Sequence, residues 1–313
     1  MSIHNYDPEI SWHEGSCVTV GVFDGVHLGH QALIDKTIEL AKSKNLKSVA
    51  LTFDPHPLAL LKPEAAPKMV YDIQKRCELI LKCGIDEVVI IQFDKTMALQ
   101  TAEQFVTSVL VKSLNSKFVV VGQDFKFGHN REGDLNYLKL WGSKLGFEAV
   151  GISLVTDGLN RVSSTLLRSA IAEGNLSVSY KIMSRHFSYI GEVIHGDSRG
   201  KEMGFPTANL KIDSNLVIPA QGVYCGYCFV GSEAKVAAIS IGIRPTFVSD
   251  APVSFEVYIL DFTESLYGKS LEVFLVEKLR EEIKFESVDD LLVEMKHDVE
   301  RSVEIVSKLN IWQ

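Results

Sequence analysis

The chain has 313 residues and a mass of 34.8 kDa, more than a single hydrophobic core usually organises, so two domains are expected. Its 46% hydrophobic and 23% charged residues exclude disordered and fibrous proteins. The net charge of −8 and pI near 5.6 exclude a broad basic surface, so a nucleic-acid partner is disfavoured and phosphate binding has to be local. No apolar run reaches the ~20 residues that span a bilayer. Five cysteines and the lack of a signal peptide predict a cytoplasmic location.

The first half of the chain alternates short β-branched runs with helical patterns. One of these patterns, at 30–44, places its apolar residues at three-to-four spacing and ends in a lysine-rich segment. This alternation predicts an α/β domain with a Rossmann-like parallel sheet, in which ligands bind at the carboxyl ends of the strands. The predicted strands are 17–22, 48–53, 87–93, 117–122 and 147–155.

After a helical stretch at about 165–184, the pattern changes to strands separated by Gly, Pro and Asp, which predicts a compact antiparallel β-barrel. We therefore expect one domain at 1–184 and a second at 185–313. An amphipathic helix at 287–308 should pack on the barrel. Cys225 and Cys228 have the spacing of a redox motif, but residues three apart on a strand point to opposite faces, so we expect two core cysteines instead.

The segment GVFDGVHLGH, at 21–30, follows a predicted strand and opens a helix. Its glycines allow close backbone approach, and the free amides of a helix N-terminus favour a phosphate. His27 and His30 are three apart, so on a helical first turn they share a face. A histidine pair at this spacing also suits a fragment of a metal site, but its position between a strand and a helix favours polyphosphate binding.

A second helix start lies at 163–168, where Ser163, Ser164 and Thr165 precede Arg168. Hydroxyls at this position can simply cap the helix. They can also hold a phosphate at the helix N-terminus. The sequence pattern alone leaves both interpretations open.

The segment GEVIHGDSRGKEMGFPTANL, at 191–210, is rich in glycine and lysine but lacks the spacing and the Ser or Thr of a P-loop. Within it, Thr207 and Asn209 lie two residues apart and hence on one side of an extended segment, where their oxygens suit a hard cation. A turn capped by Thr and Asn is the alternative. Glu256 alternates with apolar neighbours, and this pattern alone predicts a solvent-facing residue.

These motifs, in this order, resemble prokaryotic bifunctional riboflavin kinase/FMN adenylyltransferases. The first half matches through GVFDGVHLGH, FDPHP, VVGQDFKFGHNREGD and RVSSTLLRSAIAEGN, and the second through PTAN, GVY, IGIRPTF, FEVYILDF, LYG and LREEIKFES. The resemblance implies an HxGH-type nucleotidylyltransferase domain followed by a riboflavin kinase barrel with a C-terminal helix. It implies ATP-dependent phosphorylation of riboflavin to FMN in the barrel, and adenylyl transfer from ATP to FMN, giving FAD and pyrophosphate, in the first domain.

In the adenylyltransferase domain, the resemblance gives His27 and His30 the catalytic role of contacting the ATP phosphates and stabilising the charge that develops on them. No protein nucleophile is implied. The chain departs from the family pattern at Asn130, where a smaller residue is expected. The residues implied to bind ATP or the flavin are Gly21, Phe23, Asp24, Gly25, Gly122, Asp124, Phe127, Arg161, Ser164, Thr165 and Arg168.

In the kinase domain, the resemblance makes Glu256 the general base that accepts the proton of the riboflavin hydroxyl, and makes Thr207 and Asn209 ligands of Mg²⁺ bound to ATP. The substrates would be ATP, riboflavin and FMN. A homologue with one inert module and a flavin-sensing protein are the alternatives, and the sequence does not define an oligomeric state. The residues implied to bind ATP or the flavin here are Lys201, Gly204, Phe205, Pro206, Gly222, Tyr224 and Arg280.

Overall fold

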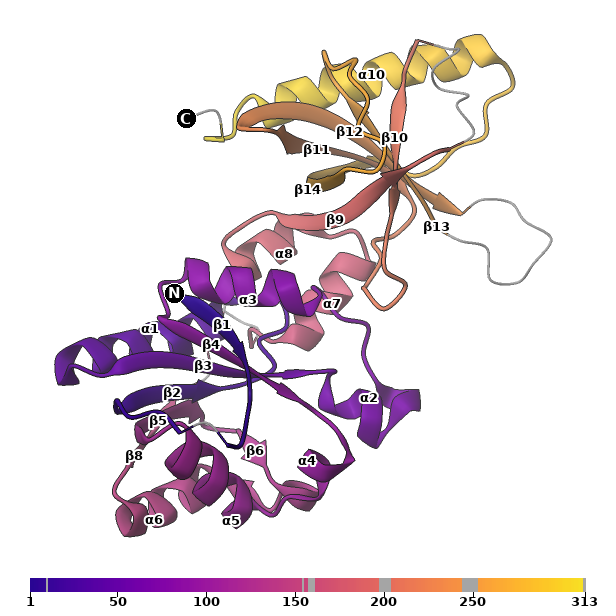
Figure 1. Cartoon of the computed structure of the whole chain (residues 1–313). Coiled ribbons are helices and arrows are strands. Elements are labelled where there is room, and N and C mark those ends of the chain that lie inside the picture. Colours follow the sequence, from indigo (N-terminus) through magenta and orange to yellow (C-terminus); the bar gives the residue numbers. More distant parts are fainter. Residues whose placement is uncertain (10, 154, 157–160, 197–203, 244–252, 312–313) are drawn as a thin grey trace. The chain divides into compact units, whose positions relative to one another are not determined.

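The computed structural model describes residues 1–9, 11–153, 155–156, 161–196, 204–243 and 253–311. The chain forms two compact units, Met1–Ser164 and Thr165–Gln313, which are described separately below (Figure 1). The predicted fold classes of both units are confirmed. The division between the compact units falls earlier in the chain than the domain boundary predicted near Arg185.

The first unit contains a six-stranded parallel sheet in the order β1-β4-β3-β2-β5-β8. Five of its strands coincide with predicted runs. The sixth, β1, pairs with β4 at the edge of the sheet and is exposed along its length, so it lacks the apolar pattern that identifies a strand. The strands are β1 (Ser2–Asn5), β2 (Ser16–Val20), β3 (Lys47–Asp54), β4 (Glu87–Gln92), β5 (Ser116–Gly122) and β8 (Glu148–Ile152).

Helices cover both faces of this sheet (Figure 1), and the unit's core lies between sheet and helices. They are α1 (Leu28–Lys44), α2 (Pro57–Leu61), α3 (Ile73–Lys82), α4 (Lys95–Leu99), α5 (Ala102–Gln104), a π-helix (Phe105–Ser113) and α6 (Leu135–Leu145). Two short 3₁₀ helices (Pro63–Ala65 and His129–Arg131) and a small hairpin of β6 (Lys126–Phe127) and β7 (Gly133–Asp134) complete the unit.

The second unit contains a closed antiparallel barrel in the order β10-β13-β12-β11-β14-β9. The helix α10 (Val288–Val306) packs on it, chiefly against β11 and β12 (Figure 1), as predicted. Cys225 and Cys228 are both fully buried on β11, and burial raises the pKa of each thiol to about 12, so neither is a reactive thiolate. The strands are β9 (Phe187–Ile194), β10 (Thr207–Lys211), β11 (Gly222–Val230), β12 (Glu233–Ile243), β13 (Val253–Ile259) and β14 (Ser270–Arg280).

Two helices precede the barrel, α7 (Ser164–Ala172) and α8 (Leu176–Met183). Helix α8 packs against β14 and β9, and the ring of Tyr180 lies 4.7 Å from that of His186, which in turn contacts Tyr227 on β11. These contacts explain why the compact unit begins before the first barrel strand. None of the helices in the described residues combines the length and the hydropathy that a membrane-spanning segment requires.

Candidate active sites

The loop from Gly21 to His27 joins β2 to α1 at the carboxyl edge of the parallel sheet. Three of its residues, Phe23, Gly25 and Val26, have positive φ angles of 54°, 79° and 38°, so the chain turns sharply here. The Phe23 ring is fully buried beneath the loop. This conformation brings the backbone of a tight turn directly to the start of a helix, which is the geometry of an anion site.

His27 and His30 lie at the start of α1, as the sequence predicts, but not both on its first turn. His27 is the N-cap, and its Nδ1 accepts a hydrogen bond from the backbone N–H of His30 at 3.3 Å. The two imidazole rings stack at 3.7 Å with an angle of 14° between them. A Cβ at Gly29 would lie 3.1 Å from the His27 ring, so glycine at this position leaves room for the stacked pair.

The segment at 162–164, far away in sequence, lies beside this loop. The Ser164 hydroxyl donates a hydrogen bond to the backbone oxygen of Asp24 at 2.9 Å, and the backbone oxygen of Val162 lies 3.9 Å from the Cβ position of Gly29. The Asp24 carboxylate is buried and accepts from the backbone N–H of Val70 at 2.9 Å. Asp24 and Ser164 therefore fix the backbone around the histidine loop. Thr165 and Arg168 follow Ser164 on α7, with Arg168 Nη2 3.5 Å from Thr165 Oγ1.

The segment after β5, which contains part of the VVGQDFKFGHNREGD motif, divides into an exposed part and a buried part. Asp124 is half-exposed and forms an ion pair with Arg161, and a Cβ at Gly122 would lie 3.1 Å from the Asp124 carboxylate. Phe127, in contrast, is buried in the core and its ring stacks on Phe125 at 5.5 Å. Its contacts explain a packing role, and its predicted part in nucleotide or flavin binding stays a prediction.

The structure accounts for the departure at Asn130. Its φ is 53° and that of Arg131 is 60°, both in the left-handed region. Asparagine tolerates this region better than most residues, so it can stand where a smaller residue is expected.

In the barrel, β10 and β13 bring together the three residues predicted to act on ATP and riboflavin. Asn209 pairs with Glu256 across the two strands, and the Thr207 hydroxyl donates to Glu256 Oε2 at 3.3 Å. Ser254 donates to Glu256 Oε1 at 3.0 Å. Because the alternate residues Phe255 and Val257 are buried in the core, Glu256 lies on the opposite face, partly accessible and surrounded by polar groups.

Two features of this cluster were not predicted from the sequence. Gly196 lies against the Asn209 side chain so closely that a Cβ at that position would collide with the amide. A Cβ at Gly242 would likewise collide with the carboxylate of Glu282, which follows β14. Burial raises the pKa of the Glu282 carboxyl, and the nearby Glu256 carboxylate adds to this effect, so the cluster contains a second carboxyl group. The sequence indicated Gly196 only indirectly, because this residue lies within the segment at 191–210.

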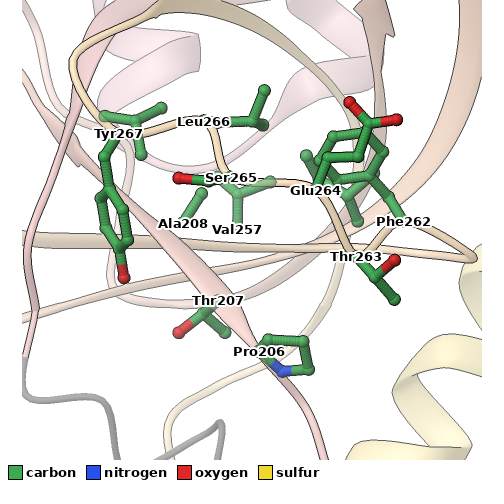
Figure 2. Close-up of a pocket in the computed structure, with 12 residues that line it drawn as sticks. Pro206, Thr207, Ala208, Val257, Phe262, Thr263, Glu264, Ser265, Leu266 and Tyr267 are labelled. Carbon is green, nitrogen blue, oxygen red and sulfur yellow. The ribbon is translucent and has the colours of Figure 1, made fainter.

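A cavity of about 180 Å³ adjoins Thr207. Figure 2 shows Pro206 and Thr207 across from a loop that includes Ser265 and Tyr267. The ring of Tyr267 also stacks on His195 at 3.9 Å. The cavity is smaller than a typical ligand pocket of ~300–1,000 Å³, so it has room for only part of a ligand of that size. Residues 266–268 form the LYG motif, for which the family resemblance implied no individual role.

The remaining predicted kinase residues have structural contacts. Phe205 packs on Tyr258 at 5.2 Å, and Gly204 has a φ of 83°. Tyr224 is fully buried, and its hydroxyl donates to the backbone oxygen of Ala220. Gly222 lies against the backbone of β14 where no side chain fits. Lys201 lies outside the described residues.

Arg280 joins the barrel to α10. Its Nε and Nη2 bind the buried carboxylate of Asp298 at 3.1 and 2.7 Å, and its guanidinium lies 5.7 Å from the centre of the Phe285 ring. This fork-like pairing is the geometry arginine favours with a carboxylate. The contacts explain a structural role, and ligand binding by Arg280 stays a prediction.

An α/β unit with a histidine loop at a helix N-terminus, and a barrel with a hydroxyl–amide–carboxylate cluster, together define a two-unit enzyme of nucleotide chemistry. The family model described as FAD synthetase matches residues 9–166, and that described as riboflavin kinase matches residues 183–306. The chain belongs to the bifunctional riboflavin kinase/FMN adenylyltransferase family.

Similar proteins span nearly the whole chain. The bifunctional riboflavin kinase/FMN adenylyltransferase of Escherichia coli K12 is 37% identical over 286 residues, covering 91% of each chain. That of Listeria monocytogenes is 34% identical and covers 93% of each. A crystal structure from Streptococcus pneumoniae, described as a macrolide-efflux protein, has a TM-score of 0.88 at 30% identity and covers 96% of this chain and 98% of that one. The efflux description belongs to that protein only. The family assignment of this chain rests on the two family models and on its curated relatives.

Proposed function

We propose that the barrel unit transfers the γ-phosphate of ATP to the 5′-hydroxyl of riboflavin, and that the histidine-loop unit transfers the adenylyl group of a second ATP to the phosphate of the resulting FMN. The products are FAD and pyrophosphate. The observation that carries this proposal is the presence of both polar clusters in one chain, the histidine loop within the residues matched by the FAD synthetase model and the Glu256 cluster within those matched by the riboflavin kinase model. A homologue with one inert module would be free to lose one of them.

In the kinase reaction, Glu256 is proposed as the general base. Its carboxylate accepts hydrogen bonds from Thr207 and Ser254, which hold it in one orientation, and it is partly accessible. It would take the proton of the riboflavin hydroxyl as the oxygen attacks the γ-phosphorus. The cavity beside Thr207 would hold part of the nucleotide, with Pro206 and Tyr267 among its walls.

The oxygens of Thr207 and Asn209 fit a divalent cation, and we propose Mg²⁺. Hydroxyl and amide oxygens on one face of β10, close to a carboxylate, are hard donors of the type this ion prefers. When bound, it would neutralise charge on the phosphates.

In the adenylyl transfer, the FMN phosphate is itself the nucleophile, so no general base is needed. The stacked imidazoles of His27 and His30 lie at the start of α1, where the helix dipole also favours an anion. We propose that they stabilise negative charge on the triphosphate as the bond to the α-phosphorus changes. Thr165, Arg161 and Arg168 are proposed to contact the pyrophosphate that leaves.

The test is to incubate the purified chain with riboflavin, ATP and MgCl₂, and to separate the flavins by chromatography over time. The proposal predicts that FMN forms first and FAD follows. Accumulation of FMN without FAD would support a single-activity enzyme. Binding of flavin without any product would support a flavin-sensing protein.

A further inference from the structure

Among the residues that the structure describes, Arg76, on α3, is one of the largest fully buried side chains, with an exposed fraction of 1%. Charged side chains are rarely buried to this extent unless they are paired. Its Nη1 donates to the backbone oxygens of Val22 at 2.7 Å and Phe53 at 3.3 Å, and its Nη2 donates to Asp54 Oδ1 at 3.2 Å. One guanidinium therefore binds two separate segments of the chain.

These two segments are the carboxyl ends of neighbouring strands. Val22 lies just beyond β2, at the start of the histidine loop, and Phe53 and Asp54 end β3, where the FDPHP motif begins. The hydroxyl of Thr52 also donates to the oxygen of Val22, at 3.1 Å, and lies 3.4 Å from Arg76 Nη1. The point where the chain leaves the sheet to form the loop is thus held by side chains from β3 and α3.

Phe23, the residue that follows Val22, is in contact with His30. Phe23 has a φ of 54°, a conformation that a non-glycine residue keeps only where its surroundings enforce it. Its buried ring meets the His30 imidazole edge-on, with 5.3 Å between ring centres. A displacement of the Val22 carbonyl would therefore shift the surface against which His30 rests.

Stability alone does not explain this arrangement. Burial lowers the pKa of Arg76 from its usual value, while the carboxylates of Asp24 and Asp54 act in the opposite direction. The buried Nε–H of Arg76 has no hydrogen-bond partner. Replacing a buried ion pair by apolar side chains often leaves the stability of the fold unchanged or increases it. A buried and incompletely paired guanidinium is therefore not the arrangement that stabilises a fold most.

We propose that Arg76 is a positioning residue for adenylyl transfer, which ties the start of the histidine loop to the end of β3 and so orients His30 toward the ATP phosphates. This inference rests on the proposed function of the first unit. It concerns the chemical step, because a loop displaced by about 1 Å can cost ~10²-fold in rate while the substrate still binds. No role in the kinase reaction is implied.

The test compares Arg76→Met and Arg76→Lys with Lys82→Met, a matched control that removes a positive charge from an exposed side chain of the same helix. Each full-length variant is assayed for FMN-to-FAD conversion and for riboflavin phosphorylation, and its melting temperature is recorded. We expect kcat for FAD formation to fall by about 10–100-fold in both Arg76 variants, with KM for ATP changed by less than about threefold. Lysine should not rescue the loss, since one ammonium cannot reach both segments.

A purely structural role predicts a different result: a lower melting temperature, but a wild-type kcat per folded molecule. That outcome, or equal kcat in Arg76→Met and Lys82→Met, would overturn the inference. If Arg76→Met does not fold, Thr52→Val removes the shared hydroxyl with little change of shape, and an unchanged kcat in that variant would overturn it as well. If the wild-type chain itself makes no FAD, the proposed function fails, and that result is distinct from active enzyme with unaffected variants.

Discussion

Replacing Glu256 by glutamine isolates its capacity to accept a proton. In the structure the carboxylate accepts hydrogen bonds from Thr207 at 3.3 Å and Ser254 at 3.0 Å. The glutamine side chain has the same shape, and its oxygen can keep one of these bonds while its amide donates to the other hydroxyl after that hydroxyl rotates. ATP and riboflavin should therefore still bind.

The expected loss in kinase turnover is that of general-base assistance, ~10²–10⁴-fold. At 1.36 kcal/mol for each factor of ten, this corresponds to about 2.7–5.4 kcal/mol of transition-state stabilisation. The assay is initial-rate formation of FMN from riboflavin, with kcat and KM determined separately. A fall in kcat with a nearly unchanged KM identifies an interaction made in the transition state.

Two controls accompany this assay. Glu192→Gln makes the same chemical change at an exposed position of β9 and should leave FMN formation unaffected. FAD formation from added FMN should also be unaffected in Glu256→Gln, because that reaction is assigned to the other unit. A kinase turnover within about twofold of wild type, far below the general-base range, would refute the reasoning and make Glu256 a bystander.

Three further predictions concern the histidine loop, the position of the Asn209 amide and the domain boundary. His30→Ala should lower FMN-to-FAD conversion by at least ~10²-fold and leave riboflavin phosphorylation near wild type, and unchanged FAD synthesis would contradict its assignment. Gly196→Ala should lower kinase turnover about tenfold or more, with little change in melting temperature, because the new methyl group displaces the Asn209 amide; wild-type kinetics would show that the position of Asn209 is not critical. Fragments that begin at residues 165 and 185 should both phosphorylate riboflavin, the longer one melting at a higher temperature because α8 packs on β9 and β14. If the shorter fragment folds but is inactive, the kinase domain begins before residue 185.

The parallel sheet was predictable because its central strands are buried on both faces and read as β-branched runs. The predicted strand at 117–122, for example, is observed at Ser116–Gly122. The barrel strand β10 was harder to identify. Its sequence, TANLK at 207–211, follows a proline and contains Asn209, a poor strand former, so the pattern indicated only an extended segment.

The site residues were identified by motif, and their geometry came only from the fold. The spacing of His27 and His30 predicted a shared helical face, whereas His27 is the N-cap and its ring stacks on that of His30. The alternation around Glu256 predicted a solvent-facing carboxylate, and it does lie opposite the core. That Thr207 and Asn209 lie beside it depends on the pairing of β10 with β13, which no local pattern specifies.

Arg76 shows most clearly what the sequence could not provide. It sits in a helical segment rich in charged residues, where an arginine is normally a solvated surface residue. Its burial follows from the packing of α3 beside the ends of β2 and β3, which is a tertiary relation between segments more than 20 residues apart. Local patterns carry no information about such long-range contacts.

The central claim is that two separate sites in one chain catalyse successive steps, and mixing two variants tests it most directly. Supplied with riboflavin, ATP and MgCl₂, His30→Ala alone should make FMN but very little FAD, and Glu256→Gln alone should make very little of either. Mixed in equal amounts, they should convert riboflavin to FAD, because FMN released by one variant is adenylylated by the other. If the mixture makes no FAD although each variant performs its own half-reaction, or if His30→Ala also fails to make FMN, the assignment of one step to each unit is contradicted.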